Sequence, residues 1–491
     1  MAEDPNDILR RGGAEALRKR VDTTPPSKVH QLRLTIGSDN EVAQCVARDL
    51  RASIGETVYC DGDFHAWCGT HWTPLSAERL HEFIREYDGC DFVAPSGRPS
   101  RYLLNKTRHN SVLHLLRLEL LQPDFFREAP LGVACRSGFI ALDEAGGVDL
   151  QTHSPDHRQR HLLEADWCGD VTETPVSGGL FDRLLSGSFK GDDEADAKVA
   201  LLAEMLGAAA FGLSIRLAEP KAIILLGETA GNGKTQVLEL MRGLLPGSAV
   251  ASVTPAEMAK EQRRAQLAGV RLNAADELGV DAIRSDTFKA IVTGDRTSGK
   301  TVYHPPFEFC PEAFHAFATN KLPPFTDGMD RGVRRRLAIL AFDRTIPAEE
   351  RIKDLGKRIA REEANAMLAM AVAGAVRLLR QGCFTETASG RQRMAEWVLV
   401  SDMVAAFFED NEVVEITGER DDKVTSKDAY VAFASWAKSE GIPDIRRPTH
   451  SQFTERAKGL DLSKIRVART GKKGTVFYGV RLRSGGGSVR R

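Results

Sequence analysis

The sequence predicts an α/β protein in which short apolar strands alternate with helices. Residues 221–226 (KAIILL) form an apolar run of strand length, and residues 236–244 (QVLELMRGL) carry apolar side chains at helical spacing. Further strand-like runs cover 269–278 and 314–320. A short apolar run is typical of a buried strand, whereas spacing of three and four residues is typical of a helix packed on one face. The alternation of these two patterns is the basis for the α/β class.

The composition is that of a globular protein with several domains. Its 491 residues suggest about three domains with large cores. The formal net charge is −1, so any affinity for nucleic acid must come from local patches. The N-terminus (MAEDPNDILRRGG) is polar, and no apolar run is long enough to cross a bilayer, so we expect a cytoplasmic protein without a membrane partner. The 8 unclustered cysteines agree with a reducing compartment.

A glycine-rich turn, GETAGNGKTQ, joins the strand at 221–226 to the helix at 236–244. Small residues let backbone N–H groups wrap a polyphosphate, a lysine neutralises it, and a hydroxyl holds Mg²⁺. The turn has one residue more than the usual spacing between Gly227 and Gly233, so we interpret it as a phosphate-binding loop with an insertion. The alternative is an ordinary glycine-rich turn. The residues expected to contact the nucleotide are Gly231, Asn232, Gly233, Lys234, Thr235 and Gln236.

Paired acids follow the next strand-like run. Residues 269–278 read GVRLNAADEL and include Asp276 and Glu277. One carboxylate can hold Mg²⁺ together with Thr235, while its neighbour polarises the water that attacks the γ-phosphate. Solvated surface acids are the alternative.

Two further features suit ATP hydrolysis. Asn320 ends the run 314–320 (FHAFATN), where it could sense the γ-phosphate from an adjacent strand. A basic cluster at 331–336 (RGVRRR) precedes the apolar run LAILAF. Arginine suits stabilising transition-state charge on a phosphate held by a neighbouring subunit, although such a cluster can also be a solvated face.

The order of these motifs resembles the superfamily 3 helicases, specifically the phage and plasmid primase-helicases related to the poxvirus primase-helicase. The family's G-x-N-G-K-[ST] loop is matched at its end, and its K-x-x-x-T-G-G-D segment is matched with one glycine fewer. A strand ending in an acid, an asparagine motif and a double arginine are also in order. The matching segments are 231–235, 271–277, 289–295, 311–323 and 335–336.

The resemblance implies a AAA+-like P-loop motor that binds ATP and Mg²⁺ and assembles as a hexameric ring on single-stranded or forked DNA. Under this resemblance a segment at 296–300 (RTSGK) would form a hairpin tip in the ring channel, where Arg296 and Lys300 meet the DNA backbone. The remaining roles follow by position. Lys234 would contact the β- and γ-phosphates, and Thr235 and Asp276 would bind Mg²⁺. Glu277 would orient the attacking water, and Asn320 would contact the γ-phosphate. Arg335 or Arg336 would contact the ATP of a neighbouring subunit.

The C-terminal pattern predicts a winged helix. Two helical stretches, 427–439 and 448–460, precede the hairpin-like KIRVARTGKKGTVFYGVRLR, and basic residues exceed acidic ones from 441 onward. We expect a recognition helix at 451–458 and a wing tip on DNA formed by Arg469, Lys472 and Lys473. The alternative is a protein-binding module.

These elements combine into a scheme of segments. We expect a mixed α/β N-terminal domain before the motor, a helical collar, a lid or connector after the motor, and a disordered tail. The N-terminus resembles the tail of a toprim-type primase domain. We therefore expect a helicase part that is either cut from a longer primase-helicase or works beside a separate primase in a bacterial host. The expected boundaries are 1–28 remnant, 29–175 N-terminal domain, 176–218 collar, 219–345 motor, 346–390 connector, 391–483 winged helix and 484–491 tail.

Three alternatives to these interpretations stay open. Cys60, His65, Cys68 and His71 lie close enough in sequence to suggest zinc, but alternation around Asp61-Gly62 and Cys68-Gly69 favours two hairpin strands. The altered loop keeps open a DNA-binding replication protein that uses ATP only for assembly. A small-molecule kinase would need an acceptor pocket and a lid, and the sequence indicates neither.

Overall fold

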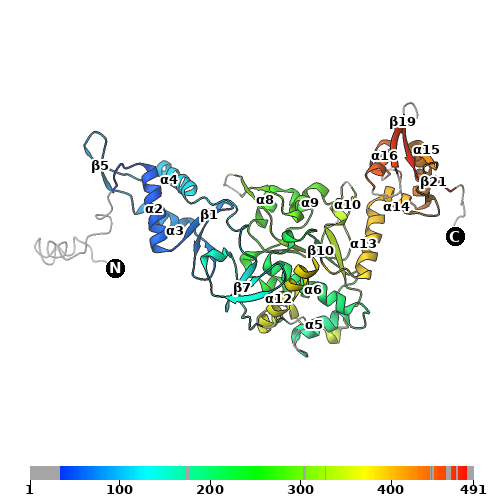
Figure 1. Cartoon of the computed structure of the whole chain (residues 1–491), viewed down its shortest axis with the longest axis horizontal. Helices are drawn as coiled ribbons and strands as arrows, with labels where there is room; N and C mark the ends of the chain where they lie inside the picture. The colour runs from blue at the N-terminus through cyan, green and yellow to red at the C-terminus, as the bar shows by residue number, and fades with distance from the viewer. Residues whose placement is uncertain are drawn as a thin grey trace, which may run out of the picture. The chain divides into compact units, whose positions relative to one another are not determined.

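The computed structural model describes residues 34–169, 171, 177–279, 281–301, 306–326, 328–442, 444, 447–460, 466–470 and 474–483. These residues divide into two compact units (Figure 1). The first unit comprises residues up to 129 together with 154–160, and the second comprises 130–153 and everything from 161 onward. The expected remnant at 1–28 and tail at 484–491 lie outside the described residues.

In its described residues, the first unit packs three helices with short antiparallel strands. Its sheet has the order β1-β2-β3, and Asp61 and Gly62 connect β1 to β2 with positive φ at both residues. A two-residue Asp-Gly connection of this kind matches the right-handed twist of the paired strands. The elements are α2 (Asp39–Ser53), β1 (Thr57–Cys60), β2 (Asp63–Trp67), β3 (Trp72–Pro74), α3 (Ala77–Arg85), β4 (Asp91–Val93), β5 (Pro99–Arg101) and α4 (Lys106–Glu119).

The hairpin interpretation of the Cys/His segment is confirmed by β1, β2 and β3. Cys60 and His65 are buried in these strands, and burial lowers the pKa of His65 to about 4. Cys68 lies in the next turn, where its Sγ is 3.3 Å from His71 Nδ1. Among the described residues, no group of three or more His, Cys, Asp or Glu side chains is arranged to hold a metal ion.

A five-stranded parallel sheet forms the centre of the second unit. Its strand order is β11-β12-β15-β10-β16, and every neighbouring pair is parallel. All residues of β10 are buried, and alternate side chains join two different hydrophobic cores, one on each face. A strand buried on both faces reads as a continuous apolar run, which is the pattern that predicted it. The strands are β10 (Ala222–Leu226), β11 (Val250–Ala251), β12 (Leu272–Ala275), β15 (Phe314–Thr319) and β16 (Leu337–Ala341).

Helices cover both faces of this sheet (Figure 1). The closest pair is α6 (Ala195–Phe211) and α12 (Ala364–Gln381), in which a Cβ at Gly207 or Gly374 would overlap the backbone of the other helix. On the same face lie α5 (Leu180–Phe189), α7 (Lys234–Leu244) and α11 (Leu355–Glu362), whereas α9 (Ser285–Thr293) and α13 (Ala388–Ser401) contribute to the core on the other. The expected helix at 195–217 ends at Phe211, because Gly212 adopts a left-handed C-cap conformation.

A second, four-stranded sheet belongs to the same unit. It contains β6 (Gly132–Cys135), β7 (Gly138–Leu142), β8 (Val148–Gln151) and β9 (Leu162–Leu163) in the order β8-β7-β6-β9. Val133 and Ile140 share a core with Leu202 and Met205 of α6. The expected N-terminal domain at 29–175 therefore does not coincide with one compact unit, because most of its second half packs with the five-stranded sheet.

The C-terminal part contains the expected order of helix, helix and hairpin. An aromatic core around Phe407, Phe433 and Phe453 holds these elements together. The elements are α14 (Met403–Glu409), β17 (Val414–Ile416), β18 (Lys423–Thr425), α15 (Ser426–Ser439), α16 (His450–Gly459), β19 (Arg466–Thr470), β20 (Gly474–Tyr478) and β21 (Val480–Leu482). The α/β class with a parallel sheet is thus confirmed. Within the described ranges, no helix is long and apolar enough to cross a membrane.

Candidate functional site

The glycine-rich loop connects the carboxyl end of β10 to the first residue of α7. Gly233, the N-cap of α7, has φ +98°, a left-handed conformation that favours glycine. Gly227 needs its small size for another reason, because a Cβ there would overlap Asn232 Nδ2 and lie 2.9 Å from Lys234 Nζ. The loop therefore folds closely around its own lysine.

Lys234 is buried at the centre of this loop, and its ammonium is surrounded by oxygen acceptors. Lys234 Nζ donates to Gly227 O at 2.8 Å, Asn232 Oδ1 at 3.0 Å and Asn320 Oδ1 at 3.0 Å. Burial lowers the pKa of Lys234. The exposed side chain of Thr235 follows at the start of α7. The side chain of Gln236 binds another segment, because its Oε1 accepts a hydrogen bond from Gly356 N at 2.9 Å.

A cavity of about 190 Å³ adjoins the loop. Residues 231–236 form one wall, and the others come from α5 and from the segment that leads into α11. The cavity combines an apolar lining with two arginines, a combination that the sequence analysis did not identify because its members are far apart in the chain. The members outside the loop are Arg183, Leu184, Gly187, Ile346, Glu350, Arg351, Ile352 and Leu355.

Asn320 reaches the loop from β15, which lies between β10 and β12. Leu226 at the end of β10 is level with Thr319 of β15, so Asn320 stands beside the first residue of the loop. Carboxyl ends of parallel strands share one sheet edge, and ligands of open α/β sheets bind at this edge where the chain turns to either side of a strand. The structure thus brings Lys234 and Asn320 together.

The two acids lie at the same sheet edge, beyond the end of β12. Asp276 Oδ2 accepts from Arg242 Nη2 at 2.7 Å, and Arg242 also donates to Ala274 O at 3.0 Å. Asp276 Oδ1 is buried and has no hydrogen-bond partner among the described residues. Glu277 is exposed and has φ +54°, a conformation uncommon outside glycine. Arg242 lies in the amphipathic helix α7, and its position in the sequence did not indicate that it contacts the site.

A further charged neighbour of the loop is Arg393 of α13. Arg393 Nη1 lies 2.9 Å from Glu228 Oε1, and Arg393 Nη2 lies 3.4 Å from Asp343 Oδ1. Glu228 is the first residue after Gly227 and is exposed, so this ion pair contributes little stability by itself. Its effect is to connect the lengthened loop to α13.

Arg335 and Arg336 differ in their surroundings. Arg336 Nε donates to Thr293 Oγ1 at 2.8 Å and Arg336 Nη1 to Gly332 O at 2.8 Å. Burial and the charge of Arg335 lower the pKa of Arg336. Arg335 is exposed just ahead of β16 and has no side-chain hydrogen bond within the described residues. Of the two, Arg335 is the one open to a neighbouring molecule.

The expected hairpin tip at 296–300 is wrong in its boundaries. Residues Thr297–Gly299 form a strand, β13, which pairs with β14 (Phe307–Phe309), so the connection between the strands begins at Lys300. Gly299 is buried, and a Cβ added there would lie only 3.0 Å from the Cα of Ala265. Gly299 therefore packs against Ala265 of its own chain. Arg296 precedes the strand and lies 4.0 Å from Glu308, whereas Lys300 is exposed.

The proposed wing residues fall partly beyond the described chain. β19 and β20 form the expected antiparallel hairpin, with Thr470 opposite Gly474. Arg469 lies within β19 and not at the tip. Lys472 and Lys473 lie outside the described residues.

Comparison with known proteins adds little. A model described as "Family of unknown function (DUF5906)" matches residues 225–336, which includes the loop, both acids, Asn320 and the arginine pair. No curated protein matches the chain.

Solved structures similar to the chain include two apo structures of the C-terminal region of NrS-1. One, an A form, has 12% identity and a TM-score of 0.44 and covers 88% of this chain and 98% of its own. The other has 12% identity and a TM-score of 0.42 and covers 89% and 99%. TM-scores below 0.5 do not establish a common fold, so the function is inferred from this chain's own residues.

Proposed function

We propose that the protein is an ATP-hydrolysing motor of the superfamily 3 helicase kind that acts on single-stranded or forked DNA. The observation that carries this proposal is the contact between Lys234 and Asn320, which are 86 residues apart in sequence and joined by a 3.0 Å hydrogen bond at one sheet edge. A buried lysine within a glycine-rich turn at the start of a helix is a phosphate-binding arrangement.

The loop fits the phosphates of a nucleotide. Lys234 is held by oxygens of the loop, and these are the contacts that phosphate oxygens would replace. The N-terminus of α7 adds backbone N–H groups and a partial positive charge. The cavity beside the loop supplies Leu184, Ile352 and Leu355 to pack against the flat face of a base, and Arg351 for charge.

The acids suit the hydrolytic step. Mg²⁺, when bound, neutralises charge on the phosphate oxygens. Thr235 and Asp276 would hold this ion, and in the part of the chain that the structure describes the buried Asp276 Oδ1 has no hydrogen-bond partner. Glu277 would accept a proton from the attacking water, and Asn320 would hold the terminal phosphate. Arg242 keeps Asp276 in place by pairing with its other oxygen.

Further parts of the proposal concern assembly and DNA. Arg335 is exposed, so it can reach an ATP bound by a neighbouring copy, as in a hexameric ring. Lys300, which is exposed and directly follows β13, would contact the DNA backbone without sequence preference. A C-terminal winged helix on DNA, a primase partner or primase domain, and a place in the cytoplasm of a bacterial host complete the proposal.

A second candidate is a DNA-binding replication protein that uses ATP only for assembly. Two observations favour it: the loop has an extra residue, and Glu228 within it is tied to Arg393. The two functions differ in one measurement, in which radiolabelled ATP is incubated with the protein and Mg²⁺ and then both bound nucleotide and released ADP are counted. A motor releases many ADP per protein, whereas an assembly switch keeps about one ATP bound per site without release. Absence of both binding and release would contradict both candidates.

A further inference from the structure

A second pocket lies at the opposite edge of the five-stranded sheet. It has a volume of about 350 Å³ and is lined by Lys221, just before β10, and by Leu337, the first residue of β16. Both positions are at the amino ends of parallel strands, whereas the glycine-rich loop leaves the carboxyl end of β10. The five residues of β10 separate the two sites by about 16 Å. We call this cavity the amino-edge pocket.

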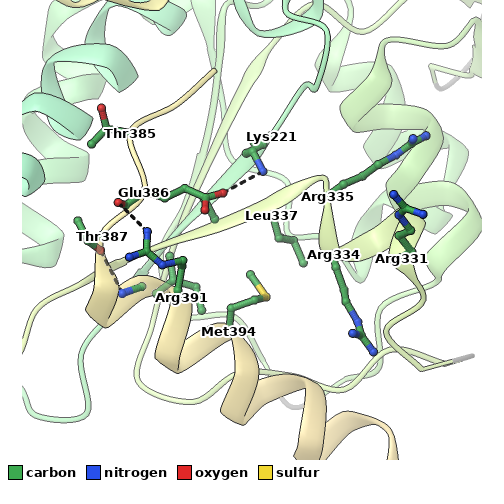
Figure 2. A pocket seen from close by; sticks show the side chains of 13 residues that line it. Lys221, Arg331, Arg334, Arg335, Leu337, Thr385, Glu386, Thr387, Arg391 and Met394 are labelled. Atoms are coloured by element: carbon green, nitrogen blue, oxygen red, sulfur yellow. Dashed lines mark hydrogen bonds and ion pairs between the residues drawn. The ribbon is translucent and has the colours of Figure 1, made fainter. Parts of the chain in front are cut away.

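The amino-edge pocket is strongly basic. Five cationic side chains line it against one carboxylate, that of Glu386; the cations are Lys221, Arg331, Arg334, Arg335 and Arg391. Lys221 Nζ lies 3.4 Å from Glu386 Oε1 (Figure 2). Within the described part of the chain, Arg334, Arg335 and Arg391 form no ion pair with an acid; Arg334 donates to Met329 O at 2.9 Å and Arg391 to Glu386 O at 3.3 Å.

The arrangement of these arginines leaves their charge open to a ligand. Figure 2 shows Arg334 and Arg335 leaving the turn ahead of β16 in different directions, while Arg391 rises from α13 on another side of the pocket. Arginines gathered without acids repel one another; next to the pocket, burial and, after it, the charge of Arg335 lower the pKa of Arg336. A bound anion would relieve the repulsion, and guanidinium groups match phosphate with paired hydrogen bonds.

The apolar part of the pocket lining, which we call the floor, favours anions that carry an apolar or aromatic group. Leu337, Ile339 and Met394 supply apolar surface between the cations. A volume of about 350 Å³ with an apolar floor fits a nucleotide, which joins a flat base to a phosphate. Arginine planes also stack on bases, and such contacts tolerate any sequence.

We propose that the amino-edge pocket binds nucleotide phosphate, either as one unit of a single-stranded nucleic acid or as a free nucleotide. Arg334 and Arg391 would hold the phosphate and Met394 would support the base. This inference goes beyond the proposed ATP site, because it concerns the opposite sheet edge and needs neither Mg²⁺ nor hydrolysis.

The test measures binding of a fluorescent 20-nucleotide oligothymidylate by anisotropy over a salt series, without ATP or Mg²⁺. The double variant Arg334→Gln/Arg391→Gln should bind about tenfold more weakly and lower the slope of log K against log salt by about 1.4, since each phosphate contact on a single strand contributes about 0.7. The matched control is Arg85→Gln/Arg98→Gln, which removes the same charge from two exposed arginines of the first unit that have no acid partner among the described residues. The control should bind like the wild type.

A second variant tests the space inside the pocket independently of its charge. Met394→Trp keeps the charge but fills the floor, so it should weaken binding at least fivefold with an unchanged salt slope.

Competition by thymidine monophosphate distinguishes a free nucleotide from a nucleic-acid strand as the ligand. Displacement by the monophosphate indicates a free-nucleotide site, whereas displacement only by unlabelled oligonucleotide indicates a strand site. Both support the proposal. It is overturned if the Arg334/Arg391 variant binds like its control, or if poly-glutamate binds the wild type in preference to the oligonucleotide.

Failure of this proposal and failure of the proposed motor are distinguishable. Lost ATP turnover with normal, pocket-dependent oligonucleotide binding contradicts only the motor. Normal turnover with equal binding by variant and control contradicts only the pocket.

Discussion

Lys234 Nζ and Asn320 Oδ1 are 3.0 Å apart, and this hydrogen bond joins the glycine-rich loop after β10 to the end of the neighbouring strand β15. The contact couples the residue that would neutralise a phosphate to the residue that would detect its terminal group. Because β15 lies between β10 and β12, the same sheet edge also carries Asp276 and Glu277.

Asn320→Ala should reduce ATP turnover by about ten- to a hundredfold with little change in KM. The amide would act on the terminal phosphate mainly as charge develops, so its loss affects kcat more than binding. Steady-state kinetics measure both constants, and Lys321→Ala, at the exposed next residue, is the matched control. Equal kcat in the wild type and the Asn320 variant would remove this residue from the site.

Mixing two inactive variants should restore part of the activity if ATP sites are shared between copies. A Glu277→Gln protein keeps its Arg335, and an Arg335→Ala protein keeps its Glu277, so about a quarter of the sites in an equal, random mixture would be complete. ATP turnover measured across mixing ratios should pass through a maximum. A flat mixing curve contradicts a shared site.

Arg336→Ala should instead lower the stability of the fold, because Arg336 donates hydrogen bonds to Thr293 and Gly332 of its own chain.

Lys300→Ala should leave ATP turnover without DNA unchanged and weaken its stimulation by single-stranded DNA at least threefold. Lys300 is exposed and remote in sequence from the loop, so its charge would serve the DNA backbone alone. Turnover is titrated with oligothymidylate, and Lys353→Ala, another exposed lysine, is the comparison. Full stimulation in the Lys300 variant would exclude this residue as the DNA contact.

His315 should make the protein less stable in acid. Burial lowers its pKa from 6.5 to about 4, and it lies in β15 with Nδ1 3.2 Å from Asn273 Nδ2. Between these pH values the unfolded chain binds more protons than the folded one, so the free energy of unfolding falls as pH decreases, by up to about 1.4 kcal/mol per pH unit. The loss begins below about pH 6.5 and ends near pH 4.

His315→Gln removes this titration and should reduce the difference in unfolding free energy between pH 7 and pH 5 by about 2 kcal/mol. Urea denaturation at the two pH values measures it, with the exposed His81→Gln as the control. An unchanged difference would mean that His315 does not titrate as its burial indicates.

Local patterns predicted most of the elements. The run 221–226 became β10, and the helix expected at 427–439 is α15, because buried strands and amphipathic helices each have a period that the sequence displays. β13 was not predicted, because Thr-Ser-Gly has neither an alternating pattern nor β-branched apolar residues, and its pairing with β14 depends on residues beyond the turn.

Long-range relationships could not be predicted from local patterns. The position of β15 between β10 and β12, the bond from Arg242 to Asp276 and the packing of 130–153 against α6 all depend on how distant segments meet. The basic residues of the amino-edge pocket come from three separate segments, so only part of that set was visible as the cluster at 331–336.

ATP hydrolysis by the purified protein, measured with and without single-stranded DNA and beside the Lys234→Ala variant, decides whether the glycine-rich loop drives a DNA-dependent motor. Lys234 is the buried cation of the loop, so its loss should abolish turnover by removing the phosphate contact. We expect turnover to rise severalfold with DNA in the wild type and to fall to background in the variant. Equal turnover in the Lys234 variant and the wild type, with or without DNA, would exclude this loop as the site of hydrolysis.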